Sequence, residues 1–201
     1  MRRFFVLITL AAVSCSGGNG EPADNSTEWL HVLRHKQAAS APNAPAHAKQ
    51  VYADTLGAFV SKHPTHSRAR EVYQRIQIDF AGELASLGRY QDAIHIYRAV
   101  LVHDPKNAAA LRGLNDAVDH LAVAREKLLA LEKGMSQRDV ARLLGKPIPG
   151  WQLRNERPDS TIESWYYRRI GGGVAGVYFR DGVLFAAEEN SQAKLAPLMR
   201  Q

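Results

Sequence analysis

The sequence predicts two folded regions in series, a short array of helices followed by a small α+β domain. Residues 46–131 place apolar side chains at helical spacing, with breaks at His63-Pro64, Gly88 and Asp104-Pro105. Residues 132–190 hold a short amphipathic helix and then runs typical of strands. We therefore expect an all-helical domain over 46–131, and two helices on a three-stranded antiparallel sheet over 132–190.

Four helices are expected in the first region. The first ends at His63-Pro64, the second runs from a Ser67 cap to Leu87, the third spans Tyr90 to His103, and the fourth follows Asn107. Their inward faces are assigned to the large apolar residues: Val51, Leu56, Phe59 and Val60; Val72, Ile76, Phe80 and Leu84; Ala93, Ile94, Tyr97, Val100 and Leu101; and Leu111, Leu114, Val118 and Leu121.

In the second region, Ser136 caps a short helix whose apolar face is Val140, Leu143 and Leu144, and Gly145 ends it. Three strands follow, over residues 162–169, 174–180 and 183–187. Asp181-Gly182 is a strong turn signal between the last two strands. Residues 191–201 are left as a C-terminal tail.

The N-terminus predicts export. Two arginines, Arg2 and Arg3, precede an apolar run over residues 4–12, which is typical of a signal peptide over residues 1–14. The run is too short to span a bilayer as a helix. One interpretation is an ordinary signal peptide followed by an incidental cysteine.

Ala12-Val13-Ser14-Cys15 resembles a bacterial lipobox. The resemblance implies that Cys15 carries the lipid, because several acyl chains together anchor a protein durably. In lipoproteins of this kind, Asp after the cysteine would signal retention. Ser16 stands at that position instead, which implies attachment to the outer membrane, with the chain facing the periplasm. Residues 15–45 are rich in Gly, Ser, Asn, Ala and Pro and are expected to be a tether. A short helix over residues 26–39 interrupts it, with Trp29, Leu30 and Leu33 available for packing.

Composition excludes several classes of protein. The chain has one cysteine, so an intrachain disulfide is impossible. The net charge is +6, but basic and acidic residues alternate without a basic stripe, so we expect no nucleic-acid partner. Two histidine pairs, His31 with His35 and His63 with His66, lack the carboxylates that would complete a metal site. We expect no metal and no cofactor.

The string GRYQDAIHIYRAVLVHDPKN, residues 88–107, resembles the second half of a tetratricopeptide repeat, a helix pair of about 34 residues. The resemblance makes Gly88 the turn glycine and Tyr90, Ala93 and Tyr97 packing positions. It implies an interaction platform whose groove accepts a peptide or a helix. The alternative is a helical spacer that holds the next domain off the membrane.

The second region resembles the SmpA/OmlA family, small lipoproteins of the outer-membrane β-barrel assembly machinery. The matching motifs are Gly134-Met135-Ser136, Leu143-Leu144-Gly145-Lys146-Pro147, Trp165-Tyr166-Tyr167 and residues 177–183, VYFRDGV. This family's members in the assembly machinery lack a repeat domain, which sets the chain apart. β-lactamase-inhibitor proteins share the general fold, so the resemblance does not fix one role.

No catalytic set is recognisable. The three glycines at 171–173 are followed by no helix and no Gly-Lys-Ser/Thr, so they are not a phosphate loop. Glu188-Glu189 is expected to be a solvated strand end. We expect a non-enzyme without a small-molecule substrate, whose protein-binding residues include Tyr90, Tyr97, Trp151, Trp165, Tyr167 and Arg169.

These observations predict a lipid-anchored scaffold for protein–protein interactions in the bacterial envelope. The leading expectation is an accessory role in outer-membrane protein assembly or envelope integrity. One alternative is a pilotin-like escort of a secretion or pilus component, which would use the helical groove. Another is an inhibitor of an envelope enzyme that acts through the α+β domain.

Overall fold

The computed structural model describes residues 26–195. The signal peptide, Cys15 and the last six residues lie outside that range. The chain divides into two compact units, the first ending at Arg70 and the second beginning at Glu71. The structure confirms a helical region followed by a small antiparallel sheet domain.

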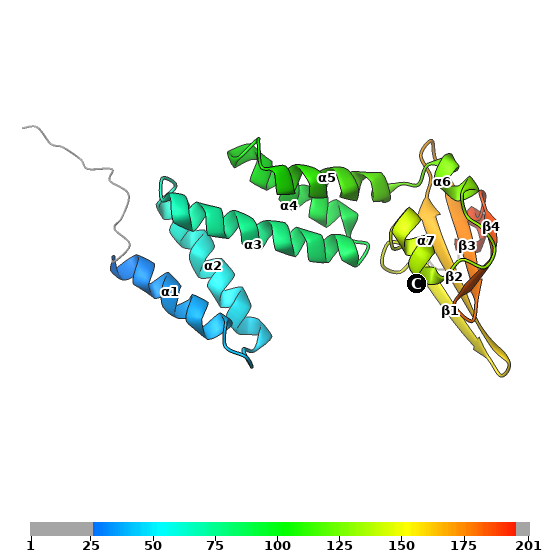
Figure 1. Ribbon diagram of the computed structural model, residues 1–201, viewed down its shortest axis with the longest axis horizontal. Helices are drawn as coiled ribbons and strands as arrows, with labels where there is room; N and C mark the ends of the chain where they lie inside the picture. The colour runs from blue at the N-terminus through cyan, green and yellow to red at the C-terminus, as the bar shows by residue number, and fades with distance from the viewer. Residues whose placement is uncertain (1–25, 196–201) are drawn as a thin grey trace, which may run out of the picture. The chain divides into compact units, whose positions relative to one another are not determined.

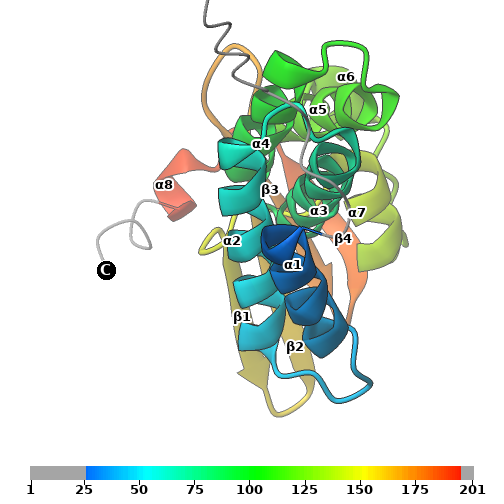
Figure 2. The same cartoon turned by 90° about the vertical axis from the view of Figure 1, so that its left-hand side faces the viewer.

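The first unit contains an antiparallel helix pair, α1 (Thr27–Ala39) and α2 (Ala46–Lys62). Figures 1 and 2 both show the two helices side by side. Trp29 and Val32 of α1 are buried, as are Leu56 and Phe59 of α2. Leu30 is exposed, so its expected packing role was wrong. The helix lies within the residues assigned to the tether, and its contact with α2 makes it part of a folded unit.

The cap of α3 (Ser67–Ser86) differs from the expected one. The His66 ring accepts a hydrogen bond at Nδ1 from the Ala69 backbone N–H, at 3.2 Å, so a side chain before Ser67 caps the helix. His66 is itself buried, with its ring centroid 4.8 Å from that of Trp29 and 5.1 Å from that of Phe59. One histidine therefore serves both the helix end and the core of the first unit.

In the second unit, α3 packs with α4 (Tyr90–His103) and α5 (Ala108–Leu121). The inward face of α4 is confirmed, with Ala93, Ile94, Tyr97 and Val100 buried.

The expected faces of α3 and α5 were partly wrong. Buried alanines lie at the helix contacts, at positions 81, 110 and 117. On these two helices, three of the large residues assigned inward are exposed instead: Phe80, Leu111 and Val118. Val51 of α2, also assigned inward, is exposed as well. Small side chains let the helix backbones approach, which leaves these larger neighbours outside the contact.

Two further helices precede the sheet, α6 (Arg125–Leu129) and α7 (Gln137–Leu144). The predicted cap of α7 is confirmed, because Ser136 Oγ accepts a hydrogen bond from the Asp139 N–H at 3.2 Å. The same hydroxyl donates to Asp139 Oδ2 at 2.6 Å. Gly145 follows the helix with φ of 76°, a conformation that favours glycine.

The sheet is a four-stranded antiparallel meander in the order β1 (Gln152–Arg157), β2 (Ser160–Arg168), β3 (Val174–Arg180) and β4 (Val183–Glu188). The expectation of three strands was therefore wrong. The missing strand, QLRNER, is exposed along its whole length and shows no apolar alternation. A last short helix, α8 (Gln192–Leu195), lies within the segment expected to be a tail.

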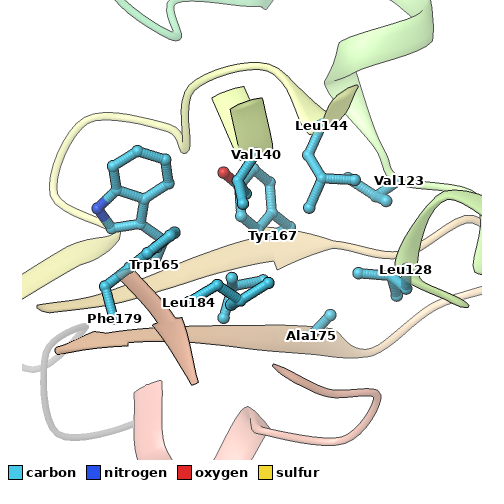
Figure 3. Close-up of a cluster of buried hydrophobic side chains, with 10 residues drawn as sticks. Val123, Leu128, Val140, Leu144, Trp165, Tyr167, Ala175, Phe179 and Leu184 are labelled. Atoms are coloured by element: carbon cyan, nitrogen blue, oxygen red, sulfur yellow. The ribbon is translucent and has the colours of Figure 1, made fainter. Parts of the chain in front are cut away.

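The core of the sheet domain lies between the sheet and helices α6 and α7 (Figure 3). Trp165, Tyr167, Val177 and Phe179 come from the sheet, and Val140 and Leu144 come from α7. On the other face of the sheet, Leu195 of α8 packs with Tyr166 and Val174. The alternation of β2 thus sends Trp165 and Tyr167 to one core and Tyr166 to another.

Candidate functional site

Two tyrosines expected to bind partners hold one turn in place. The Tyr90 hydroxyl, at the start of α4, donates to the Lys146 carbonyl at 2.9 Å. The Tyr167 hydroxyl, from β2, donates to the neighbouring Gly145 carbonyl at 3.0 Å. The turn after α7 is therefore bonded to both the helical array and the sheet. Burial raises the pKa of the Tyr167 phenol, which keeps this donor protonated.

Close backbone packing reinforces this junction. A Cβ on Gly88 would stand 2.3 Å from the Pro147 carbonyl oxygen, and the φ of Gly88 is 79°. The His120 ring of α5 stacks on Tyr90 with centroids 5.9 Å apart. Val123, between α5 and α6, exchanges backbone hydrogen bonds with the end of β2 and with Ile170. The expected boundary at residue 131 therefore lies inside one compact unit.

Four of the six residues expected to bind protein are buried: Tyr90, Tyr97, Trp165 and Tyr167. The Tyr97 ring lies against Gly113, where an added Cβ would stand 2.3 Å from the ring. Trp165 and Phe179 pack with ring centroids 4.7 Å apart in the core. These side chains pack within the fold, and whether any of them also contacts a partner stays a prediction.

The other two residues lie at the surface and interact within the chain. Trp151 is half-buried, and the Arg168 guanidinium lies 5.5 Å from its ring centroid. Arg169 is half-buried and binds Glu189, with Nη2 to Oε2 at 3.1 Å and Nη1 to the backbone carbonyl at 3.1 Å. Of the six, Trp151 is the one whose aromatic ring is partly accessible.

The two acidic residues at the end of β4, Glu188 and Glu189, interact within the chain. Glu188 accepts hydrogen bonds from Lys194, Tyr178 and Ser191, at 2.7, 3.1 and 3.0 Å. The Lys194 hydrogen bond, followed by those from the two hydroxyls, holds the Glu188 pKa below its ordinary value. This cluster fastens α8 to β4.

The second unit has a groove on α3, α4 and α5, with a volume of about 820 Å³. Phe80 and Val118 stand at its surface, 52% and 48% exposed, while Leu84 is buried at its base. Its polar lining includes Arg89, Asp92, His95 and Arg98. We call this feature the α3–α5 groove. The sequence placed Phe80 and Val118 in the core, although the small residues one position away, Ala81 and Ala117, indicated where the helices touch.

The described part of the chain contains no cluster of three or more His, Cys, Asp or Glu side chains arranged to hold a metal ion. His31 and His35 do meet, with ring centroids 4.7 Å apart and planes at 86°. His63 instead pairs with Glu28 at 2.5 Å. The absence of a cofactor and of catalysis stays a prediction.

None of the helices within residues 26–195 has the length and apolar character needed to cross a membrane. No family model, curated protein or solved structure matches this chain. Both family resemblances therefore rest on the motifs quoted above.

Proposed function

We propose that the chain is a non-enzymatic, lipid-anchored protein of the bacterial envelope that binds other proteins through the α3–α5 groove. In this proposal Cys15 carries the lipid and holds the chain on the periplasmic side of the outer membrane. The helices are a tetratricopeptide-like array, and residues 132–190 are an SmpA/OmlA-like domain. The role is accessory to outer-membrane protein assembly or envelope integrity.

The groove is the observation that carries this proposal. Phe80 and Val118 expose large apolar side chains over an apolar base, and Arg89 and Arg98 contribute to its polar lining. Protein interfaces commonly combine an apolar centre with a polar rim and are enriched in Phe and Arg. Exposed apolar surface of this kind often marks a binding site. The motifs of the sheet domain support barrel assembly as the setting.

The test places a photo-crosslinking amino acid at position 118 of the full-length chain in bacterial membranes. The proposal expects crosslinks to a subunit of the β-barrel assembly machinery. Position 102 provides the matched control, because Val102 is also a valine of the same array, is 76% exposed, and lies outside the groove. Val118→Asp should abolish co-purification of that subunit, and Val102→Asp should preserve it.

Four results would overturn the proposal. Equal crosslinking from positions 118 and 102 would remove the groove as the binding site. A pilus or secretion subunit at position 118 would favour an escort role, and an envelope hydrolase would favour inhibition. If the Cys15→Ala variant still incorporates labelled fatty acid, Cys15 is not the site of lipid attachment. Deleting residues 132–201 is a poor test, since the deletion also breaks the Tyr90–Lys146 junction.

A further inference from the structure

The two edges of the sheet differ in how their backbone groups are satisfied. Along β4, the outer edge bonds to the segment before α7, with Leu184 N–H to the Met135 carbonyl at 2.8 Å and Gly134 N–H to the Leu184 carbonyl at 2.9 Å. Along β1, within residues 26–195, the ladder is formed with β2 on one side only. Within residues 26–195, the edge of β1 is therefore open along its length, whereas the edge of β4 is bonded at Leu184.

The strand register identifies the backbone groups that face outward. Tyr166 N–H donates to the Trp151 carbonyl at 3.0 Å, which makes these two residues a hydrogen-bonded pair. Bonded and non-bonded pairs alternate along an antiparallel ladder. Gln152, Arg154 and Glu156 consequently direct their N–H and C=O groups away from β2. Such a row of unpaired groups is a template for another strand.

Two of these three outward-facing residues carry opposite charges. Arg154 and Glu156 lie on the same face of β1 and pair with each other, with Nε to Oε1 at 2.9 Å. Their side chains are 60% and 71% exposed, so both charges are available to a neighbour. Arg154 also reaches Glu163 of β2 at 3.1 Å.

We propose that two copies of this chain pair through their β1 edges in antiparallel orientation, with Asn155 on the two-fold axis. In this register Arg154 of each copy lies opposite Glu156 of the other. In the ladder between the two copies, each outward-facing residue must pair with another outward-facing residue. The two-fold axis must therefore pass through an odd-numbered residue or through one of the outward-facing residues themselves.

Charge selects among these centres. Centring on Arg154 sets two arginines opposite each other, and centring on Glu156 sets two glutamates opposite each other. Centring on Leu153 leaves Arg154 facing Gln152, and Glu156 faces a residue beyond the strand. Centring on Asn155 alone matches both charges of each copy with opposite charges, and opposite charges directly across a ladder stabilise it.

An edge contact of six residues is small, and interfaces of low area are weak, so a covalent trap is the suitable readout. Facing residues in a non-hydrogen-bonded site lie about 4.5 Å apart at Cα, which a disulfide can bridge. The full-length Asn155→Cys variant should form a disulfide-linked dimer under mild oxidation. The unaltered chain controls for Cys15, and Arg157→Cys controls for position, since Arg157 would face Leu153 of the second copy.

Charge reversal supplies an independent test in the Asn155→Cys background. Arg154→Glu alone and Glu156→Arg alone each set like charges opposite each other, so each should lower the dimer yield by about tenfold. An equimolar mixture of the two variants restores opposite charges and should recover mixed dimers. Melting midpoints of each variant separate loss of pairing from loss of fold.

The proposal fails if Asn155→Cys yields no more dimer than the unaltered chain. It also fails if Leu153→Cys gives the dimer instead, because that result places the two-fold axis at Leu153, two residues from Asn155. Equal yields from the single reversals and their mixture would show that charge does not select the register.

Discussion

The hydroxyls of Tyr90 and Tyr167 donate to carbonyls of adjacent residues, at 2.9 and 3.0 Å, although 77 positions separate the two tyrosines in the sequence. One tyrosine belongs to the helical array and the other to the sheet. Both bonds end on the Gly145-Lys146 turn. The turn is therefore bonded to two regions that the sequence presents as separate domains. We expect residues 71–195 to unfold cooperatively.

Tyr90→Phe removes one donor at this turn and leaves the Lys146 carbonyl without it. We expect the free energy of unfolding to fall by about 1 kcal/mol, the ordinary value for a buried hydrogen bond. Urea unfolding of the full chain measures the loss. Tyr73→Phe is the matched control, because no hydrogen bond to the half-buried Tyr73 hydroxyl is present among the described residues. Separate transitions for the helices and the sheet would contradict the cooperative junction.

Two glycines that both face Tyr97 should respond oppositely to alanine. In Gly113→Ala the new Cβ would stand 2.3 Å from the Tyr97 ring, so we expect a loss of about 1–3 kcal/mol from overpacking. In Gly82→Ala it would stand 3.7 Å from the Tyr97 hydroxyl, an ordinary contact. The second variant should gain about 0.5–1 kcal/mol from helix propensity.

Thermal unfolding of the two variants side by side checks this prediction. Both replacements are glycine to alanine within α-helices, so propensity alone predicts gains at both positions. A stabilised Gly113→Ala would mean that Tyr97 moves readily out of its place. Adding Tyr97→Leu to Gly113→Ala should recover part of the loss if the ring is the obstacle.

Helical spacing predicted where the helices of the second unit lie but not which side each one buries. On α4 the large residues do pack inward, because its stripe is continuous. On α5 a row of alanines lies beside a row of large apolar residues. Periodicity alone predicts that the row of larger side chains is the buried one. The buried row is Ala110 and Ala117, since the facing Tyr97 fills the space. The exposed row contributes to the α3–α5 groove, where Phe80 and Val118, expected in the core, are exposed.

The strands of the sheet, like the helices, could be predicted only in part. The apolar strands β2, β3 and β4 were predictable from alternation, and the Asp181-Gly182 turn is confirmed by φ values of 51° and 79°. Strand β1 is held by its ladder with β2 and buries none of its side chains, so it leaves no apolar signal. The junction tyrosines were singled out as important residues, but their long-range partners are backbone carbonyls, which carry no mark in the sequence.

His66 should be the most sensitive polar residue of the first unit. His66→Ala loses both the cap on Ala69 N–H and the ring between Trp29 and Phe59, so we expect a loss of about 2–4 kcal/mol. His66→Asn keeps a capping acceptor and should lose less. Hydrogen exchange of the buried Leu56 amide reports on this unit. Equal losses in the two variants would assign the whole effect to packing.

Docking of α8 should weaken in acid. Hydrogen bonding from Lys194, and then from Ser191 and Tyr178, keeps the Glu188 pKa below its ordinary value of 4.5 in the folded chain. A depressed carboxyl pKa stabilises the fold at pH values above 4.5, and this contribution is lost as the pH falls through the folded-state pKa. The protection factor of the Leu195 amide, which bonds to the Ser191 carbonyl, should therefore drop as the pH is lowered from 6 to 3.

The drop should be roughly fivefold or less, because the ion pair is largely exposed and water screens it. Lys194→Gln removes the main cause of the pKa shift, so its Leu195 protection should be lower at pH 6 and flatter with pH. Lys133→Gln, another exposed lysine, should follow the unaltered chain. If Lys194→Gln keeps the full pH dependence, another carboxylate controls α8, and Glu189 with its Arg125 and Arg169 partners becomes the next to test.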